Sequence, residues 1–405
     1  MSSPSTISLR EALKFWTKLG FISFGGPAGQ IAVLHQELVE KRRWISERRF
    51  LHALNYCMLL PGPEAQQLVT YIGWLMHRSW GGILAGSLFV LPSLLILIAL
   101  SWVYITFGQV PWIAAIFFGI KPAVTAIVLH AAVRIGKRTI HNNALKWIAL
   151  CSFLAIFVLN LSFPIIVLIA AAIGYWGGKR YPEYFQQSGH GNKDIAHYGA
   201  AIIDDNTPTP PHAQFRIQKT VLHSVVALCC WLIPIGMLGL VFGWKTLYPN
   251  IAWFFTKAAL LTFGGAYAVL PYVYQGAVDH FHWLSANQMM DGLALGETTP
   301  GPLIMVVAFV GFVGGYAKAV LGSEHLLWAG AVAAVLVTWF TFLPSFVFIL
   351  AGGPFIESTR GHLALLPFTG ISTYSSRAKT RAWTERPSPW YAADAAYVTS
   401  QFLAS

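Results

Sequence analysis

The sequence predicts an all-α, polytopic membrane protein made of two homologous repeats. Two observations support this: long apolar segments with few charges, and an internal duplication. The segment Phe15–Pro63 aligns without a gap onto Phe254–Pro302, at a constant offset of 239 residues, with 14 identities in 49 positions. Glycines and prolines recur at the same places in both copies, so we expect broken or re-entrant helices.

The composition is that of a chain embedded in a bilayer. Of its 405 residues, 56% are hydrophobic and only 11% are charged, whereas a soluble protein carries about 25% charged residues. Segments near the roughly 20 residues that cross a bilayer are predicted to span it. They are Gly81–Ile105, Trp112–Val133, Trp147–Trp176 (interrupted near Asn160–Pro164), Val221–Phe242 and Leu326–Leu350.

The net charge of +11 does not indicate nucleic-acid binding, because the basic residues lie in loops between apolar segments. The polar start Met1–Lys14 has no apolar core or cleavage site, so we expect no signal peptide. The cysteines lack paired or metal-ligand spacing, and we expect them to be buried as small hydrophobic residues. They are Cys57, Cys151, Cys229 and Cys230.

Four parts follow one another along the chain. We predict a first repeat over 8–178, a polar linker over 179–219, a second repeat over 220–373 and an atypical polar tail over 374–405. The linker composition predicts little fixed structure. In the tail, Arg, Lys and Glu replace the apolar residues that follow the matching part of the first repeat. Each would cost about 2.5–3.5 kcal/mol at the bilayer centre. A final span is therefore missing from the expected pattern.

Loop charges favour repeats of opposite orientation. The loop Gln36–Arg49 is rich in lysine and arginine, whereas its counterpart Gln275–Gln288 has neither. Cytoplasmic loops are the positive ones, so the two loops should face opposite sides. The remaining basic loops also fall on the cytoplasmic side if the Gly-Gly and Pro-Gly-Pro segments are re-entrant hairpins.

The duplicated breaks predict a cavity for an anion. Half-helices that end at such breaks present unpaired N–H groups and a partial positive charge to the membrane interior. Kinks that serve only packing are the alternative, but duplication of the motif favours a functional cavity. Gln66, Gln67, Thr298 and Thr299 adjoin the breaks and offer neutral hydrogen bonds to oxyanion oxygens.

Charged residues near the breaks have two interpretations each. Lys18 and Lys257 occupy equivalent positions, where they either attract an anion at the cavity mouth or extend to the membrane interface. Lys121 lies in an apolar stretch and is a further functional candidate. Glu64 and Glu297 either carry protons during transport, since apolar surroundings favour a protonated carboxyl, or cap helices or pair with Lys18 or Lys257.

Other chemistries find little support. His35, His52 and His130 have no ligand spacing and are expected to be polar lining or interfacial residues. There is no phosphate-binding glycine loop that would indicate ATP-driven transport. No cofactor is expected, and a membrane-embedded reductase would need a redox site that the sequence does not contain.

Together the motifs resemble those of the long-chain, two-domain chromate ion transporters. The resemblance covers roughly residues 8–372 and departs from the family after Thr373, where the family continues into the membrane. It rests on Phe24-Gly25-Gly26-Pro27, Pro61-Gly62-Pro63-Glu64-Ala65, Tyr71-Ile72-Gly73, Phe263-Gly264-Gly265-Ala266-Tyr267 and Glu297-Thr298-Thr299-Pro300-Gly301-Pro302.

The resemblance implies export of chromate across the inner membrane, which would confer chromate resistance. A carrier of sulfate or another oxyanion, or a non-functional copy with an altered end, are the alternatives. The partners expected are the oxyanion and the lipid bilayer; a homodimer is compatible with the sequence. The residues predicted to bind the oxyanion are Lys18, Phe24, Gly25, Gly26, Pro61, Gly62, Pro63, Gln66, Lys257, Phe263, Gly264, Gly265, Thr298, Thr299, Pro300, Gly301 and Pro302, and those predicted to carry protons are Glu297 and Glu64.

Overall fold

The computed structural model describes residues 7–24, 26–140, 143–159, 161, 163–180, 198–262 and 266–358. Within these ranges the regular secondary structure is helical, with one isolated β-bridge in the loops, which confirms the predicted all-α class. The chain divides into two compact units, which we describe separately. The larger comprises Met1–Val124, His197–Val269 and Val273–Ser358, and the smaller Thr125–Ala196, Leu270–Tyr272 and Thr359–Ser405.

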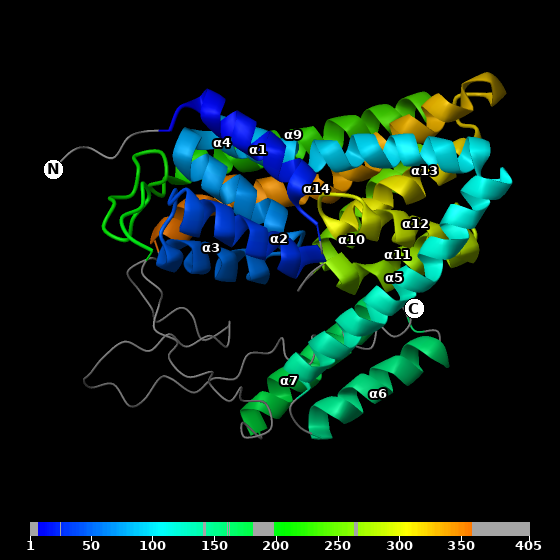
Figure 1. Cartoon of the computed structure of the whole chain (residues 1–405), viewed down its shortest axis with the longest axis horizontal. Helices are drawn as coiled ribbons and strands as arrows, with labels where there is room; N and C mark the ends of the chain where they lie inside the picture. The colour runs from blue at the N-terminus through cyan, green and yellow to red at the C-terminus, as the bar shows by residue number, and fades with distance from the viewer. Residues whose placement is uncertain are drawn as a thin grey trace. The chain divides into compact units, whose positions relative to one another are not determined.

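The helices follow the order of the duplicated sequence (Figure 1). The first repeat contains α1 (Leu9–Ile22), α2 (Gly26–His35), the π-helical turn η1 (Gln36–Lys41), α3 (Glu47–Leu59) and α4 (Glu64–Phe107), followed by α5 (Pro111–Thr139), α6 (Asn143–Phe157) and α7 (Phe163–Arg180). The second contains α9 (Ile217–Phe242), α10 (Leu247–Leu261), η2 (Ala266–Val269), α11 (Leu270–Tyr274), the π-helical turn η3 (Gln275–His280), α12 (Ala286–Thr298), η4 (Leu303–Met305), α13 (Val306–Lys318), η5 (Ser323–His325) and α14 (Leu326–Ser358).

The duplication is visible in local backbone geometry. The turns η1 and η3 begin at equivalent residues, and each is followed by a left-handed residue, Arg43 in one copy and His282 in the other. The repeated Trp-x-Ser motif explains the next helix start, because the Ser46 and Ser285 hydroxyls accept hydrogen bonds from the first turns of α3 and α12. The same short sequence therefore builds the same break twice.

The two repeats have opposite orientations. Helix α4 is kinked at His77 and Arg78. The part beyond the kink is the counterpart of α14, because Leu91-Pro92-Ser93 matches Leu343-Pro344-Ser345. Along their contact Gly82 lies against Leu350 and Gly86 against Phe346, so residue numbers rise on one helix as they fall on the other. Equivalent helices that pack antiparallel are related by an axis perpendicular to both, which confirms the predicted inverted repeat.

The broken segments are re-entrant. Gly62, just before α4, lies against Ser345 in the middle of α14, whereas Tyr71 reaches Glu357 at the end of α14. These positions on α14 are separated by about 18 Å of helix. The chain therefore passes along α3 to the middle of the unit and returns along the first part of α4. The second repeat makes the same approach, since Asp291 of α12 hydrogen-bonds to Tyr104 at the end of α4 and Gly301, just after α12, lies against Ser93 in the middle of α4.

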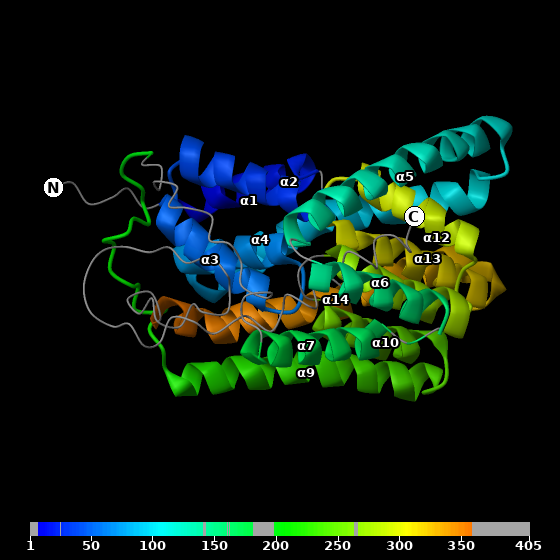
Figure 2. The same ribbon diagram turned by 90° about the horizontal axis from the view of Figure 1, so that it is seen from below.

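Among the residues that the structure describes, three helices are long and apolar enough to cross a membrane, by length and composition: Glu64–Phe107, Ile217–Phe242 and Ser323–Ser358. Helices α9 and α14 lie side by side in the larger unit (Figure 2). Shorter apolar helices cover Leu145–Ile156, Pro164–Gly174 and Leu303–Lys318. The predicted segment Trp147–Trp176 is thus two helices, α6 and α7, interrupted where the sequence indicated.

Cys57 is buried, as predicted for all four cysteines, but Cys151 and Cys229 are exposed and Cys230 is half-buried. The prediction is wrong for the exposed pair. Apolar helices that face lipid accept the same residues as a protein core, so composition does not separate the two environments.

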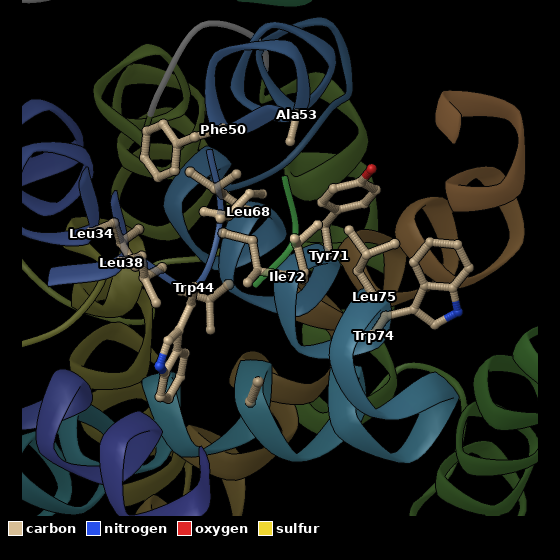
Figure 3. Close-up of a cluster of buried hydrophobic side chains, with 14 of the residues drawn as sticks. Leu34, Leu38, Trp44, Phe50, Ala53, Leu68, Tyr71, Ile72, Trp74 and Leu75 are labelled. Carbon is tan, nitrogen blue, oxygen red and sulfur yellow. The ribbon is translucent and has the colours of Figure 1, made fainter. Parts of the chain in front are cut away.

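The linker also departs from the prediction. Its second part, from Tyr198 onward, is packed on the first repeat and ordered by backbone hydrogen bonds. Ile203 bridges Ile45, and the Ser46 N–H donates to the Ile203 carbonyl at 3.0 Å. Ile203 is buried in an apolar cluster to which η1, α3 and α4 contribute. Figure 3 shows Leu38, Phe50 and Leu68 of this cluster. The expectation of little fixed structure is therefore wrong for this part, because apolar residues among the polar ones provide a docking contact.

Ile203→Asp is expected to release this docked segment, because it places a charge in an apolar cluster. Limited proteolysis of the membrane-embedded protein should then cut within residues 198–213 much faster than in the parent chain. The exposed neighbour Asn206, changed to aspartate, supplies a matched control with the same new charge. Equal cleavage of both variants would contradict the docking.

Candidate functional site

The helix breaks of the two repeats are joined by a crossed pair of hydrogen bonds. The N–H of Gly62 donates to the carbonyl of Thr262 at 2.7 Å, and the N–H of Gly301 donates to the carbonyl of Ser23 at 2.7 Å. Gly62 and Gly301 are equivalent residues, as are Ser23 and Thr262. Each Pro-Gly-Pro break is thus held by the residue that ends the helix before the Gly-Gly motif of the other repeat.

Glycine is required at both Pro-Gly-Pro positions. Gly62 has φ +121° and Gly301 has φ +101°, in a region that other residues rarely adopt. A Cβ at Gly62 would lie 2.3 Å from Ser345 Oγ, and one at Gly301 would lie 2.7 Å from Ser93 Cβ. The backbone of each break therefore packs directly on a serine of the opposite repeat.

Helices begin at these breaks and point their N-termini to the centre. α2 starts at Gly26, α4 at Glu64, and η4 leads into α13 from Leu303. The first N–H groups of a helix have no partner within it and carry a partial positive charge, which favours an anion. The predicted residues Gly25, Phe263, Gly264 and Gly265 lie outside the described residues.

Polar side chains surround the breaks. Gln66 and Gln67 are fully buried; Gln67 Nε2 donates to the Pro61 carbonyl at 2.8 Å, and Gln66 Nε2 donates to Thr70 Oγ1 at 3.0 Å. In the described part of the chain, the Oε1 atoms of both glutamines and the hydroxyl of Ser93 are buried without a hydrogen-bond partner. Buried polar atoms are normally satisfied, so this centre has unused binding capacity.

The serines of this centre were missed by the sequence analysis. Ser93 and Ser345 are fully buried and lie against the two glycines. The signal was present, because Leu91-Pro92-Ser93 matches Leu343-Pro344-Ser345. We did not predict that these repeated serines face the breaks, since only the fold brings the long helices to them. Gln30, also buried, donates a hydrogen bond to the Gly301 carbonyl.

The predicted carboxylates both lie at this centre. Glu64 is buried in the first turn of α4. Glu297 accepts a 2.6 Å hydrogen bond from the Tyr267 hydroxyl, and that ring lies against Gly26 of the other repeat. Glu297 is thereby linked to both repeats, whereas its sequence counterpart in the first repeat is Met58. The proton-carrying candidates are not symmetric.

The predicted threonines and lysines are placed less favourably for direct binding. Thr298 and Thr299 donate their hydroxyl protons to carbonyls one turn earlier in α12. Lys18 and Lys257 are exposed, on α1 and α10. Lys257 Nζ lies 5.7 Å from the centre of the Trp253 ring. A hydrogen bond from Lys41 lowers the pKa of Glu37, and the charge of Lys18 lowers it further by a smaller amount.

Among the histidine candidates, His35 lies between Glu40 and Glu47, His52 contacts the Ile356 carbonyl, and His130 is exposed on α5. These positions fit polar or interfacial roles. Among the described residues there is no group of three or more side chains suited to a metal ion.

Two ion pairs with a buried carboxylate lie away from the centre. Lys121, singled out from the sequence, forms a 3.0 Å ion pair with Asp291 of α12, which also accepts a 2.9 Å hydrogen bond from Tyr104. Arg49 of α3 forms a 2.8 Å ion pair with Glu357 of α14. Asp291 and Glu357 were not predicted, since an isolated carboxylate near a predicted helix end indicates nothing by itself.

Comparison with known proteins gives the family. The model of the family described as chromate transporter matches residues 10–175 and 249–374, which is most of the chain and both repeats. The chain belongs to the chromate transporter family. The two matched regions agree with the inverted repeats in the structure, and the second ends next to the predicted polar tail.

This family member has curated relatives over most of its length. It is 30% identical to a chromate transport protein of Cupriavidus metallidurans, over 93% of this chain and 82% of that protein. It is 33% identical to a chromate transport protein of Pseudomonas aeruginosa, over 86% and 73% of the two chains. An uncharacterized transporter of Bacillus subtilis matches 40% of this chain over 90% of its own length, at 28% identity. No solved structure matches the chain.

Proposed function

We propose that this chain is a secondary transporter that exports chromate across the cytoplasmic membrane and so confers chromate resistance. Two named relatives are chromate transport proteins, and the crossed helix breaks carry the proposal structurally. They present helix N-termini and buried, unpartnered polar atoms to one place between two inverted repeats. The protein is proposed to be a multi-pass protein of the inner membrane with the arginine-rich loop around Arg43 in the cytoplasm.

The energetics agree with export. Chromate is a dianion near neutral pH, and an inside-negative potential favours exit by about 2.3 kcal/mol per charge at 100 mV, or roughly 4.6 kcal/mol for two charges. Export therefore needs no ATP. The charge of chromate alone makes outward movement favourable. A proton gradient would add to this driving force only if a carboxylate exchanges protons during transport.

The proposed binding site is the junction of the four breaks. The helix N-termini near Gly26, Glu64 and Leu303 would hold the oxyanion, with Gln66 and Ser93 supplying side-chain hydrogen bonds. Lys18 and Lys257 would act at a distance, by attracting the anion to the mouths of the pathway. Access would alternate by movement of one repeat against the other.

The proposal is tested in inverted membrane vesicles, whose interior corresponds to the outside of the cell. Vesicles with an inside-positive potential should accumulate chromate, and a potential uncoupler should stop this. The same assay with excess sulfate distinguishes a chromate carrier from the main alternative, a sulfate carrier. Sulfate that is transported faster than chromate would identify a sulfate carrier, and no transport of either ion would indicate a non-functional copy.

Glu297→Gln is expected to remove the dependence of transport on a pH gradient. The neutral amide cannot exchange a proton, but it can still accept the Tyr267 hydrogen bond, so the local structure should persist. Chromate flux at fixed potential would be measured with and without the gradient. Tyr267→Phe, which keeps the carboxyl, is the matched control and should retain the dependence. A pH-gradient response in Glu297→Gln equal to that of the parent would remove this residue from coupling.

A further inference from the structure

The first charged contact outside the centre joins the two repeats at one end of the larger unit. Arg49 is 4% exposed and lies near the start of α3; Glu357 is buried near the end of α14. Their ion pair is 2.8 Å long, and the Tyr71 hydroxyl donates to the other carboxylate oxygen. A re-entrant hairpin of the first repeat is thereby fastened to the long helix of the second.

The second contact joins the repeats in the reverse sense. Asp291, 5% exposed, is on α12 of the second repeat. It accepts a hydrogen bond from Tyr104 near the end of α4 and pairs with Lys121 of α5. A re-entrant hairpin of the second repeat is thereby fastened to the long helix of the first.

These contacts lie at opposite ends and are related by the repeat symmetry. Helices α4 and α14 pack antiparallel, so Tyr104 at the end of one and Glu357 at the end of the other are at opposite ends of the contact. The counterpart of Asp291 in the first repeat is His52, whose ring contacts the carbonyl of Ile356, next to Glu357. The first and second contacts therefore occupy equivalent positions in the two inverted repeats.

We infer that the two ion pairs are clasps that close opposite mouths of the transport pathway and open alternately. This inference rests on the proposed function, since it assigns positioning residues to that pathway. An unpaired buried charge is costly, so the buried Arg49–Glu357 pair is favoured either when formed or when both groups reach water. In the second pair the Asp291 carboxylate is buried and Lys121 is 36% exposed, so the same cost falls on the carboxylate. Each clasp thus has two discrete states. The first clasp ties a hairpin to the long helix of the other repeat through Arg49 and Glu357, and the second does so through Asp291 and its hydrogen bond from Tyr104. Opening one end by rocking the repeats therefore presses the other end closed. In this structure both pairs are formed.

The native Cys57 provides a test. It is fully buried on α3, about two turns beyond Arg49, so a reagent in water reaches its thiol only when the packing at this end of the larger unit opens. In a background with Cys151, Cys229 and Cys230 changed to serine, a membrane-impermeant maleimide is applied from the Arg49 side. Glu357→Gln is expected to raise the labelling rate of Cys57 by at least about fivefold, the lower end of ordinary coupling between sites.

The discriminating variant is Glu357→Gln combined with Asp291→Asn. If the clasps alternate, Asp291→Asn also favours the form that is open at the other end. The form open at the Arg49 end is then less populated, and the labelling rate of Cys57 falls back toward that of the parent chain. If the ion pairs only stabilise the fold, a second broken pair loosens the protein further and labelling rises. Labelling equal to or above that of Glu357→Gln alone would overturn the inference, as would no increase in Glu357→Gln itself.

Two controls keep the outcome interpretable. Arg49→Gln with Glu357→Gln removes the clasp without leaving an unpaired buried charge, and should label like Glu357→Gln if the single variant folds poorly. Glu37→Gln breaks ion pairs within a single hairpin and should leave labelling unchanged. The assay contains no oxyanion. If Cys57 labelling rises in Glu357→Gln and falls again in the double variant, but no chromate flux is found, only the proposed function is contradicted. If chromate flux is found without that labelling pattern, only the clasps are contradicted.

Discussion

Gly301→Ala is expected to abolish chromate transport in a chain that still reaches the membrane. The new Cβ would lie 2.7 Å from Ser93 Cβ, and φ of +101° is unfavourable for alanine. Strain of this kind costs about 1–3 kcal/mol, before the collision is counted. Relief of the strain requires the break to move away from Ser93 and to release the hydrogen bond to the Ser23 carbonyl. Flux per inserted protein is the measurement, and Gly62→Ala should behave alike.

Two glycine variants separate the causes. Gly322 also has positive φ, at +88°, but nothing lies within 4 Å of its Cβ position; Gly236 has open space and an ordinary helical backbone. Gly322→Ala should lower stability slightly and retain transport, and Gly236→Ala should change neither. Transport by Gly301→Ala at the rate of Gly322→Ala would mean that contact of the break with Ser93 is not needed.

Glu357→Gln is expected to cause the largest loss of stability among single polar substitutions in the first clasp. It leaves the buried Arg49 guanidinium without its counter-charge, and breaking a buried pair in this way costs about 3–5 kcal/mol. Thermal unfolding in detergent measures the change. The double variant Arg49→Gln with Glu357→Gln should recover most of it, because no unpaired charge remains.

The matched comparison is the ion pair between Lys41 and Glu37, whose lysine side chain is 55% exposed. Removal of the Glu37 charge leaves Lys41 and Arg42, whose side chains are 55% and 32% exposed, so no buried charge is left unpaired and Glu37→Gln should shift the unfolding temperature little. If Glu357→Gln and Glu37→Gln shift it equally, the Arg49 pair is not the buried, desolvated contact described above.

The sequence was sufficient for the architecture, because duplication and helix-breaking residues are local signals. The offset between Phe15 and Phe254 located both repeats, and the basic loop before Arg49 indicated their inversion. The Gly-Gly and Pro-Gly-Pro motifs located the breaks. What the sequence could not show is that the breaks of one repeat hydrogen-bond to those of the other, since the Gly62 to Thr262 contact joins residues far apart in the chain.

The side chains around the breaks were predicted less well. Gln66, Glu64 and Glu297 lie at the centre, as expected from their places beside the motifs. Thr298 lies beside a motif as well, but its hydroxyl proton is used within its own helix. The missed residues, Ser93 and Asp291, come from helices distant in sequence. Their importance depends on tertiary packing, which a single sequence does not reveal.

The most direct test of the account is chromate flux into proteoliposomes that contain the purified chain as their only protein. With an imposed potential that is positive inside, we expect accumulation in the parent chain and in Gly236→Ala, and none in Gly301→Ala. That result would place an oxyanion pathway at the crossed helix breaks. Equal accumulation in all three would contradict the account, because transport would then not depend on the breaks.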